Sequence, residues 1–197
     1  MMYSNIKNYI KLTYEKALSN SKKRIAKYIL FFLAVIESII FPIPVDPLLA
    51  FMVLAEKKKF FKLTIICTLG SVLGGIFGWL IGYYFGNDIQ NLFILIPWIT
   101  EEMFLKVLSA HNEHGNLIVF LGAFTPLPFK IICVSSGIFG IELIDFTIMA
   151  FIGRGLRFFI ISILVKNYGE QAIKFVNERL FLITTLIGVI IILMFYF

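Results

Sequence analysis

Five ionisable side chains lie inside otherwise apolar stretches of this sequence: Glu37, Asp46, Lys130, Arg154 and Arg157. A charged group at the centre of a bilayer costs about 3 kcal/mol on insertion scales, so such residues face a cavity or one another. The set has a surplus of positive charge, and paired arginines bind phosphate oxygens through their N–H groups. It therefore predicts a site for an anion such as a phosphate head group, or alternatively a structural network of ion pairs.

The composition indicates the surroundings of these charges. Of the 197 residues, 59% are hydrophobic and only 15% are charged, and the mean hydropathy is +0.91. Soluble domains are about half apolar and about a quarter charged, so the chain is predicted to be a membrane protein. The net charge of +6 is then expected from basic loops facing anionic lipid, which excludes nucleic acid as a partner.

Enzyme motifs are missing from the sequence. It has no serine-hydrolase elbow, no zinc-protease helix motif and no phosphate-binding loop. Cys67 and Cys133 lie in apolar stretches and are expected to be buried small side chains. We therefore expect no enzyme, no cofactor and no metal site.

Closely spaced prolines break two of the apolar stretches. The first stretch, residues 28–55, contains Pro42 and Pro44, and the second contains Pro126 and Pro128. Proline lacks an N–H group and clashes with the preceding turn, so no continuous helix passes through these points. The first stretch has basic residues on both flanks and the second has acidic ones. Because basic loops stay in the cytoplasm, each stretch is predicted to be a re-entrant hairpin, and the two enter from opposite sides.

The two proline motifs form an internal repeat with an offset of 84 residues, from Pro42 to Pro126. Interrupted segments in two inverted halves indicate a transport site at the bilayer midplane. The second residue after each motif is Asp46 in one half and Lys130 in the other. We therefore predict that the tips meet with Asp46 and Lys130 as an ion pair, close to Glu37 and to one of the two arginines.

A glycine ladder marks the span between the hairpins, residues 63–86. Its members, one in every four residues, are Gly70, Gly74, Gly78 and Gly82. Small residues at this spacing let another backbone approach closely, so the ladder is predicted to be a helix-packing groove. An acidic loop over residues 87–115 is expected to follow it, outside the cytoplasm.

The predicted fold class is an all-α polytopic membrane protein. It consists of two inverted re-entrant helical hairpins, about three transmembrane helices and an N-terminal amphipathic helix. Residues 1–28 form the basic amphipathic segment, residues 29–168 the membrane domain with the inverted repeat, and residues 180–197 the C-terminal transmembrane helix. The other two spans are expected over residues 63–86 and 143–165.

Four motifs, in this order and spacing, resemble the DedA family. They are Glu37 with Pro42-Ile-Pro-Val-Asp46, the glycine-rich segment 69–75, segment 122–130 and segment 153–158. This is the SNARE-associated or VTT-domain superfamily, and the likeness is to its YqaA-like branch. The family's first-hairpin acids match Glu37 and Asp46. Its second-hairpin motif usually carries two arginines, and Lys130 stands in place of the second.

The resemblance implies a location and a function. Bacterial members lie in the inner membrane, and the charge pattern adds a cytoplasmic N-terminus. The family is implicated in moving lipids such as undecaprenyl phosphate or phospholipids between leaflets, and some members are thought to be proton-coupled. We therefore expect a lipid flippase or scramblase, whose partners are membrane lipids with an anionic or phosphate-bearing head group. Assembly into a homo-oligomer stays open.

Two alternatives make different predictions about the structure. A proton-coupled transporter of a small solute or ion should have an aqueous vestibule on its axis, whereas a lipid transporter should open laterally towards the bilayer. A membrane scaffold without transport should keep all five charges paired and have no cavity.

Overall fold

The computed structural model describes residues 24–39, 45–94, 114–125, 129–169 and 171–172, and within these ranges the chain is helical and has no strand. The elements follow one another as α2 (Arg24–Ile39), α3 (Val45–Ala55), the short 3₁₀-helix η1 (Lys57–Lys59), α4 (Phe60–Ile94), a helix over His114–Phe124, α6 (Phe129–Ile138) and α7 (Leu143–Tyr168). The predicted all-α class is confirmed.

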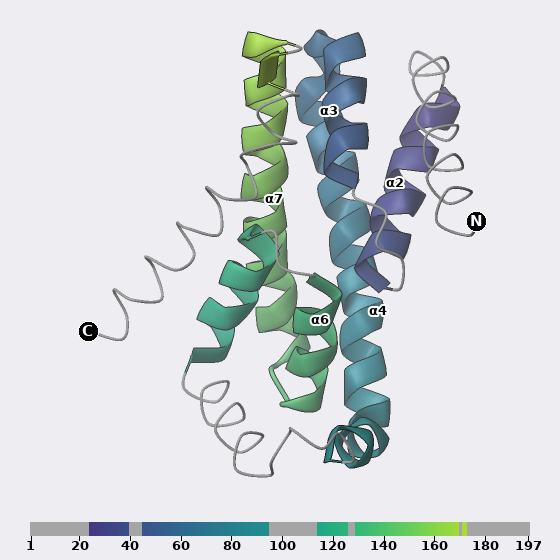
Figure 1. Ribbon diagram of the computed structural model, residues 1–197, viewed down its shortest axis with the longest axis vertical. Coiled ribbons are helices and arrows are strands. Elements are labelled where there is room, and N and C mark those ends of the chain that lie inside the picture. Colours follow the sequence, from purple (N-terminus) through teal and green to yellow (C-terminus); the bar gives the residue numbers. More distant parts are fainter. Residues whose placement is uncertain (1–23, 40–44, 95–113, 126–128, 170, 173–197) are drawn as a thin grey trace, which may run out of the picture.

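The first two helices form a hairpin that reaches about halfway along the molecule. In Figure 1, α2 runs from the upper end to about mid-height, and α3 returns to the upper end, where η1 leads into α4. Because a helix rises 1.5 Å per residue, about 20 residues are needed for it to cross a bilayer. With 16 and 11 residues, α2 and α3 are too short to cross alone.

The second hairpin has the opposite direction. The helix His114–Phe124 rises within the lower half to about mid-height, α6 descends again, and α7 then runs to the upper end (Figure 1). With 10 residues, α6 is also too short to cross a bilayer. The two short helix pairs therefore approach the middle of the molecule from opposite ends.

Two helices of the described chain are long and apolar enough to cross a membrane. They cover Lys57–Gly86 and Leu143–Tyr168. The predicted spans at 63–86 and 143–165 fall within them. The third predicted span, 180–197, and the N-terminal amphipathic segment up to residue 23 lie outside the described residues.

One predicted boundary is wrong. Helix α4 continues to Ile94, so the loop expected from residue 87 begins later. No proline follows Gly86 until Pro97, and glycine alone does not stop a helix that other contacts support. Residues 24–28 of the predicted amphipathic segment lie in helix α2.

The glycines of α4 lie where other helices approach most closely. A Cβ atom on Gly70 or Gly74 would lie 2.5 or 2.3 Å from a backbone carbonyl oxygen of α2. On Gly82 it would lie 2.0 Å from the Val134 carbonyl oxygen of α6, and on Gly78 it would lie 2.8 Å from the Cys133 Cβ. The ladder therefore receives α2 along its first half and α6 along its second half.

Charged side chains separate along the axis of the molecule. The end where α4 begins and α7 stops, here called the basic end, carries Lys57, Lys58, Lys59, Lys62 and Lys166. The opposite end, called the acidic end, carries Glu142 and Asp145 at the start of α7. Between the ends, α2, α4 and α7 expose large apolar side chains such as Phe32, Phe77 and Ile148. An apolar flank between two polar ends is the surface that a bilayer requires.

Candidate functional site

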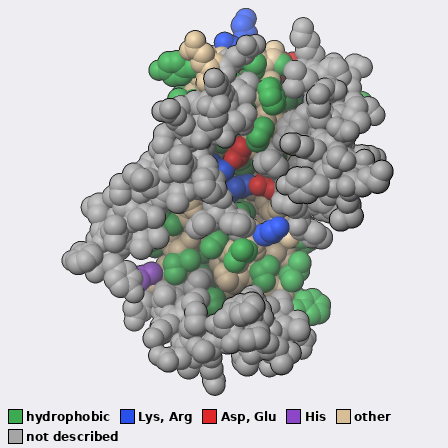
Figure 2. All heavy atoms as spheres, in the orientation of Figure 1, with side chains coloured by type: hydrophobic (Ala, Val, Ile, Leu, Met, Phe, Trp, Pro, Cys, Tyr) green, Lys and Arg blue, Asp and Glu red, His purple; other side chains and the backbone are tan. Residues whose placement is uncertain are grey.

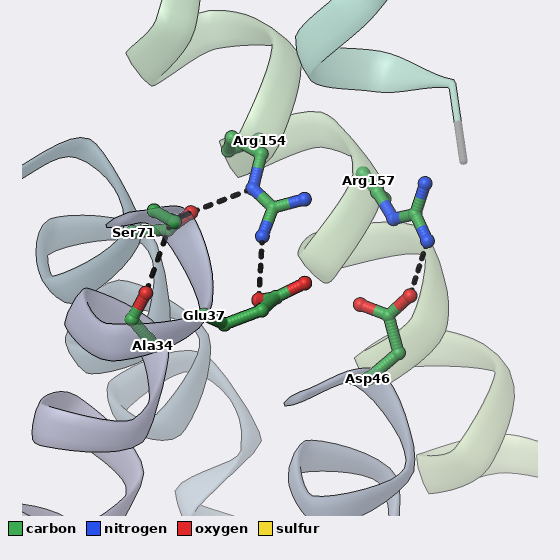
Figure 3. A network of polar contacts seen from close by, with 7 residues as sticks. Ala34, Glu37, Asp46, Ser71, Arg154 and Arg157 are labelled. Carbon is green, nitrogen blue, oxygen red and sulfur yellow. Dashed lines mark hydrogen bonds and ion pairs between the residues drawn. The ribbon is translucent and has the colours of Figure 1, made fainter. Parts of the chain in front are cut away.

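Four of the five predicted site residues converge in the middle of the molecule (Figure 3). Glu37 lies in the last turn of α2 and Asp46 in the first turn of α3, on either side of the break between these helices. Arg154 and Arg157 lie near the middle of α7. They are three residues apart and therefore share one helix face, which turns towards the tip of the first hairpin.

Arg154 is held by groups from three other helices. Its Nη2 donates a hydrogen bond to Glu37 Oε2 of α2 at 3.0 Å, and its Nε donates to Ser71 Oγ of α4 at 2.7 Å. The guanidinium carbon also lies 5.1 Å from the ring centre of Phe129 and 4.7 Å from that of Phe158. Cation–π contacts of a desolvated guanidinium contribute about 2 kcal/mol. Arg154, with 3% of its side chain exposed, therefore ties both hairpins to the two long helices.

A short chain of hydroxyl groups completes this arrangement. Ser71 Oγ lies 2.9 Å from Ser38 Oγ, and Ser38 donates to the Ala34 carbonyl oxygen at 3.0 Å. Because Ser38 gives its proton to that carbonyl, Ser71 is the donor to Ser38 and the acceptor from Arg154. The buried polar groups around Arg154 thus have partners that are consistent with one another.

Arg157 has a different environment. Its Nη2 donates to Asp46 Oδ2, while Nε and Nη1 are buried and have no hydrogen-bond partner among the described residues. Leaving a buried donor without a partner costs about 1–3 kcal/mol. Only 9% of the Arg157 side chain is exposed, so bulk solvent does not compensate for this cost. Within the described part of the chain these two nitrogens have no acceptor, which makes them candidate donors for a ligand.

The site is partly exposed to the surface where its two carboxylates lie. The side chains of Glu37 and Asp46 are 23% and 17% exposed, whereas those of Arg154 and Arg157 are 3% and 9% exposed. Figure 2 shows red and blue side chains together on the surface at mid-height of this face. A group that enters from the side would thus meet the carboxylates first and the guanidinium groups behind them.

The structure pairs Asp46 with Arg157. The predicted pair of Asp46 with Lys130 stays a prediction. Lys130 lies in the first turn of α6 and is half-buried. The four hairpin-tip prolines lie outside the described residues.

Sequence reasoning did not select Ser71, Phe129 and Phe158 as parts of the site. A signal for Ser71 was present, since it is the hydroxyl residue next to the start of the glycine ladder. The two rings gave no signal, because phenylalanine is common throughout this chain. Among the described residues no group of His, Cys, Asp and Glu could hold a metal ion.

These features define a class of protein: a helical membrane protein in which two oppositely directed, broken-helix hairpins meet beside buried arginines. The chain belongs to the VTT domain family, whose model matches residues 41–167. The predicted family is thereby confirmed. The matched range includes Asp46, Arg154 and Arg157, and Glu37 lies just before it. Membership and the apolar helices together make this a membrane protein with a transport-associated function.

Relatives of the chain occur in two bacteria. An uncharacterized protein of Haemophilus influenzae is 34% identical over 158 residues, which is 80% of this chain and 81% of the relative. An uncharacterized protein of Histophilus somni is 29% identical over 185 residues, which is 90% of this chain and 96% of the relative. No solved structure matches the chain.

Proposed function

We propose that this protein moves phosphate-bearing lipids between the leaflets of the bacterial inner membrane, as a flippase or scramblase. The observation that carries the proposal is the buried Arg157, which has two nitrogen donors, Nε and Nη1, without a partner among the described residues. A guanidinium group binds phosphate oxygens through its N–H donors. Arg157 is therefore the residue that binds the head group.

Asp46 acts as the counter-ion of Arg157 when no lipid is bound. The two side chains form an ion pair, and a phosphate group that approaches Arg157 competes with the Asp46 carboxylate. Uptake of a proton by Asp46 converts the carboxylate to a carboxylic acid, removes its charge and frees Nη2 of Arg157. Protonation of Asp46 and binding of an anionic head group would thus occur together, which provides a route for proton coupling.

Arg154 and Glu37 have a positioning role in this mechanism. Arg154 is paired with Glu37, bonded to Ser71 and placed against two rings. It lies three residues before Arg157 on α7 and fixes that part of the helix against the first hairpin. Lys130 stays a predicted site residue and would add positive charge from the second hairpin.

The orientation in the membrane follows from the two charged ends. Lysine-rich loops are retained in the cytoplasm, so the basic end faces the cytoplasm and the acidic end faces outwards. The first hairpin, and with it the N-terminal side of α2, then enters from the cytoplasm. The second hairpin enters from outside, so the two tips meet near the midplane, where a head group has to cross.

A membrane scaffold without transport is the second candidate. It is favoured by Arg154, whose Nε and Nη2 both have acceptors. Nε and Nη1 of Arg157, which have no partner among the described residues, favour transport instead, because a purely structural pair gains nothing from buried donors without acceptors.

Reconstitution into liposomes with a fluorescent phospholipid tests the proposal. The protein should accelerate movement of the lipid between leaflets, and Arg157→Gln should abolish this movement while the variant still folds. Lys58→Gln removes one positive charge from the basic end, far from the site, and serves as the control with full activity. The exchange Asp46→Arg with Arg157→Asp should fold but should not move lipid. Full activity of that exchange variant would identify the pair as a structural strut and remove the proposed site.

A further inference from the structure

A groove at the basic end of the molecule is separate from the arginine site. It has a volume of about 640 Å³ and is lined by Lys27, Tyr28, Phe31, Phe32, Lys62 and Ile66. These residues belong to the start of α2 and the start of α4. Lys27 is ten residues before Glu37, which corresponds to about 15 Å along the helix. We call this feature the lysine groove.

Two positive charges flank the lysine groove, and none of the described residues that line it is acidic. Lys27 is half-buried and Lys62 is exposed. Neither forms an ion pair with a described residue. Like charges near one another are stabilised by an anion between them, and basic pockets between helices at the cytoplasmic side of membrane proteins bind anionic head groups.

The remaining wall of the lysine groove is apolar and continues onto the lateral surface. Phe31 and Ile66 line it, and Phe32 has 58% of its surface exposed. Beyond it the exposed apolar residues Ile36 and Leu69 extend the same two helix faces towards the middle of the molecule. A free inorganic anion would match the lysines but leave this wall in contact with water. The combination fits a molecule with an anionic head and hydrocarbon chains.

We propose that the lysine groove binds an anionic phospholipid from the leaflet at the basic end. The lipid phosphate lies between Lys27 and Lys62, and the acyl chains follow Phe31, Phe32 and Ile66 towards the midplane. Because its ligands come from α2 and α4, the lipid joins the first hairpin to the long helix. This inference requires that the chain lies in a membrane, and it is independent of whether the protein moves lipid.

Lipid retention by the full chain tests the proposal. The detergent-solubilised protein is mixed with phosphatidylglycerol and phosphatidylcholine, and the bound lipid is measured by native mass spectrometry. The wild type should retain phosphatidylglycerol in preference to phosphatidylcholine. Lys27→Gln and Lys62→Gln should each reduce this preference about fivefold, since a lysine near an anionic surface contributes a factor of that order. Lys58→Gln, an exposed lysine at the same end outside the groove, should leave it unchanged.

A second variant separates the groove from general surface charge. Ile66→Trp fills the apolar wall and keeps both lysines, so it should reduce retention of phosphatidylglycerol as the lysine variants do. Acetylation by a lysine-reactive reagent provides a readout at single residues. In phosphatidylglycerol vesicles, relative to phosphatidylcholine vesicles, Lys27 and Lys62 should become protected while Lys58 does not.

Several results would overturn the proposal. An equal effect of Lys58→Gln would indicate unspecific attraction to the basic end, and displacement of the lipid by millimolar inorganic phosphate would indicate a site for the free anion. Crosslinks between Lys62 and residues 1–23 that lipid does not reduce would show that the chain itself fills the groove. The liposome assay and the retention assay test different proposals. If the protein does not move lipid but still retains phosphatidylglycerol, only the proposed function is refuted.

Discussion

Replacing Arg154 and Arg157 separately by methionine should distinguish the structural role of Arg154 from the ligand-binding role of Arg157. Both arginines are buried in α7 and each is paired with one carboxylate of the first hairpin. Methionine keeps much of the side-chain length and apolar surface, and it removes the charge and the donors. The two variants should nevertheless differ in stability, because the two guanidinium groups differ in how completely they are bonded.

The Arg154→Met variant should lose about 3–5 kcal/mol of unfolding free energy. Breaking a buried pair by removing one partner costs about this amount, and here Glu37 is left without its partner at mid-membrane depth. Ser71 loses its donor, and the cation–π contacts with the two rings are lost as well. Glu37→Gln in the same chain should recover part of the loss, since it removes the unpaired charge.

The Arg157→Met variant should change the unfolding free energy by no more than about 1–2 kcal/mol. It breaks the pair with Asp46, at a similar cost of about 3 kcal/mol. It also removes two buried nitrogen donors that have no partner among the described residues, and a buried donor without a partner costs about 1–3 kcal/mol. Asp46 further keeps a favourable position in the first turn of α3, near the positive end of the helix dipole. Transport should be abolished all the same.

Thiol reactivity provides the assay. Cys67 and Cys133 are fully buried in the wild type, one in each of the two core clusters. They become accessible to a maleimide reagent only when the surrounding helices separate. Labelling against denaturant concentration in micelles therefore gives the stability of each half. Arg154→Met should expose both cysteines at lower denaturant, because Arg154 contacts both clusters. Equal destabilisation by the two variants would refute the distinction between a structural Arg154 and a ligand-binding Arg157.

Two further predictions concern packing and orientation. Gly82→Ala should destabilise the protein by about 1–3 kcal/mol, because its Cβ would lie 2.0 Å from a backbone carbonyl oxygen. The control Gly155→Ala should be neutral or slightly stabilising in the same unfolding assay, because its Cβ would make an ordinary contact at 3.7 Å. A membrane-impermeant thiol reagent applied to intact inner-membrane vesicles of known sidedness should label Lys58→Cys and Glu142→Cys from opposite faces, and labelling of both from one face would exclude the proposed inverted hairpins.

The sequence alone determined the class of the protein and the position of its breaks. Composition and hydropathy are local properties, so they indicate a membrane protein without any knowledge of packing. Proline positions likewise mark where a helix ends, because the missing N–H and the steric clash belong to the residue itself. The charges inside apolar stretches identified Glu37, Asp46, Arg154 and Arg157 as candidate site residues, because burying a charge in a membrane costs free energy and such residues mark functional sites.

The tertiary structure decided which of these residues meet. Two acids and three bases allow several pairings, and the repeat favoured the two tips, Asp46 with Lys130. In the structure the first hairpin pairs with α7, through contacts between residues 117 and 111 positions apart. That choice depends on how the glycine ladder seats α2 against α4 and on which face of α7 then turns inwards. Among the described residues it also gave acceptors to Nε and Nη2 of Arg154 and left Nε and Nη1 of Arg157 without one. Residue type and spacing do not contain this difference, because it arises from the surrounding atoms.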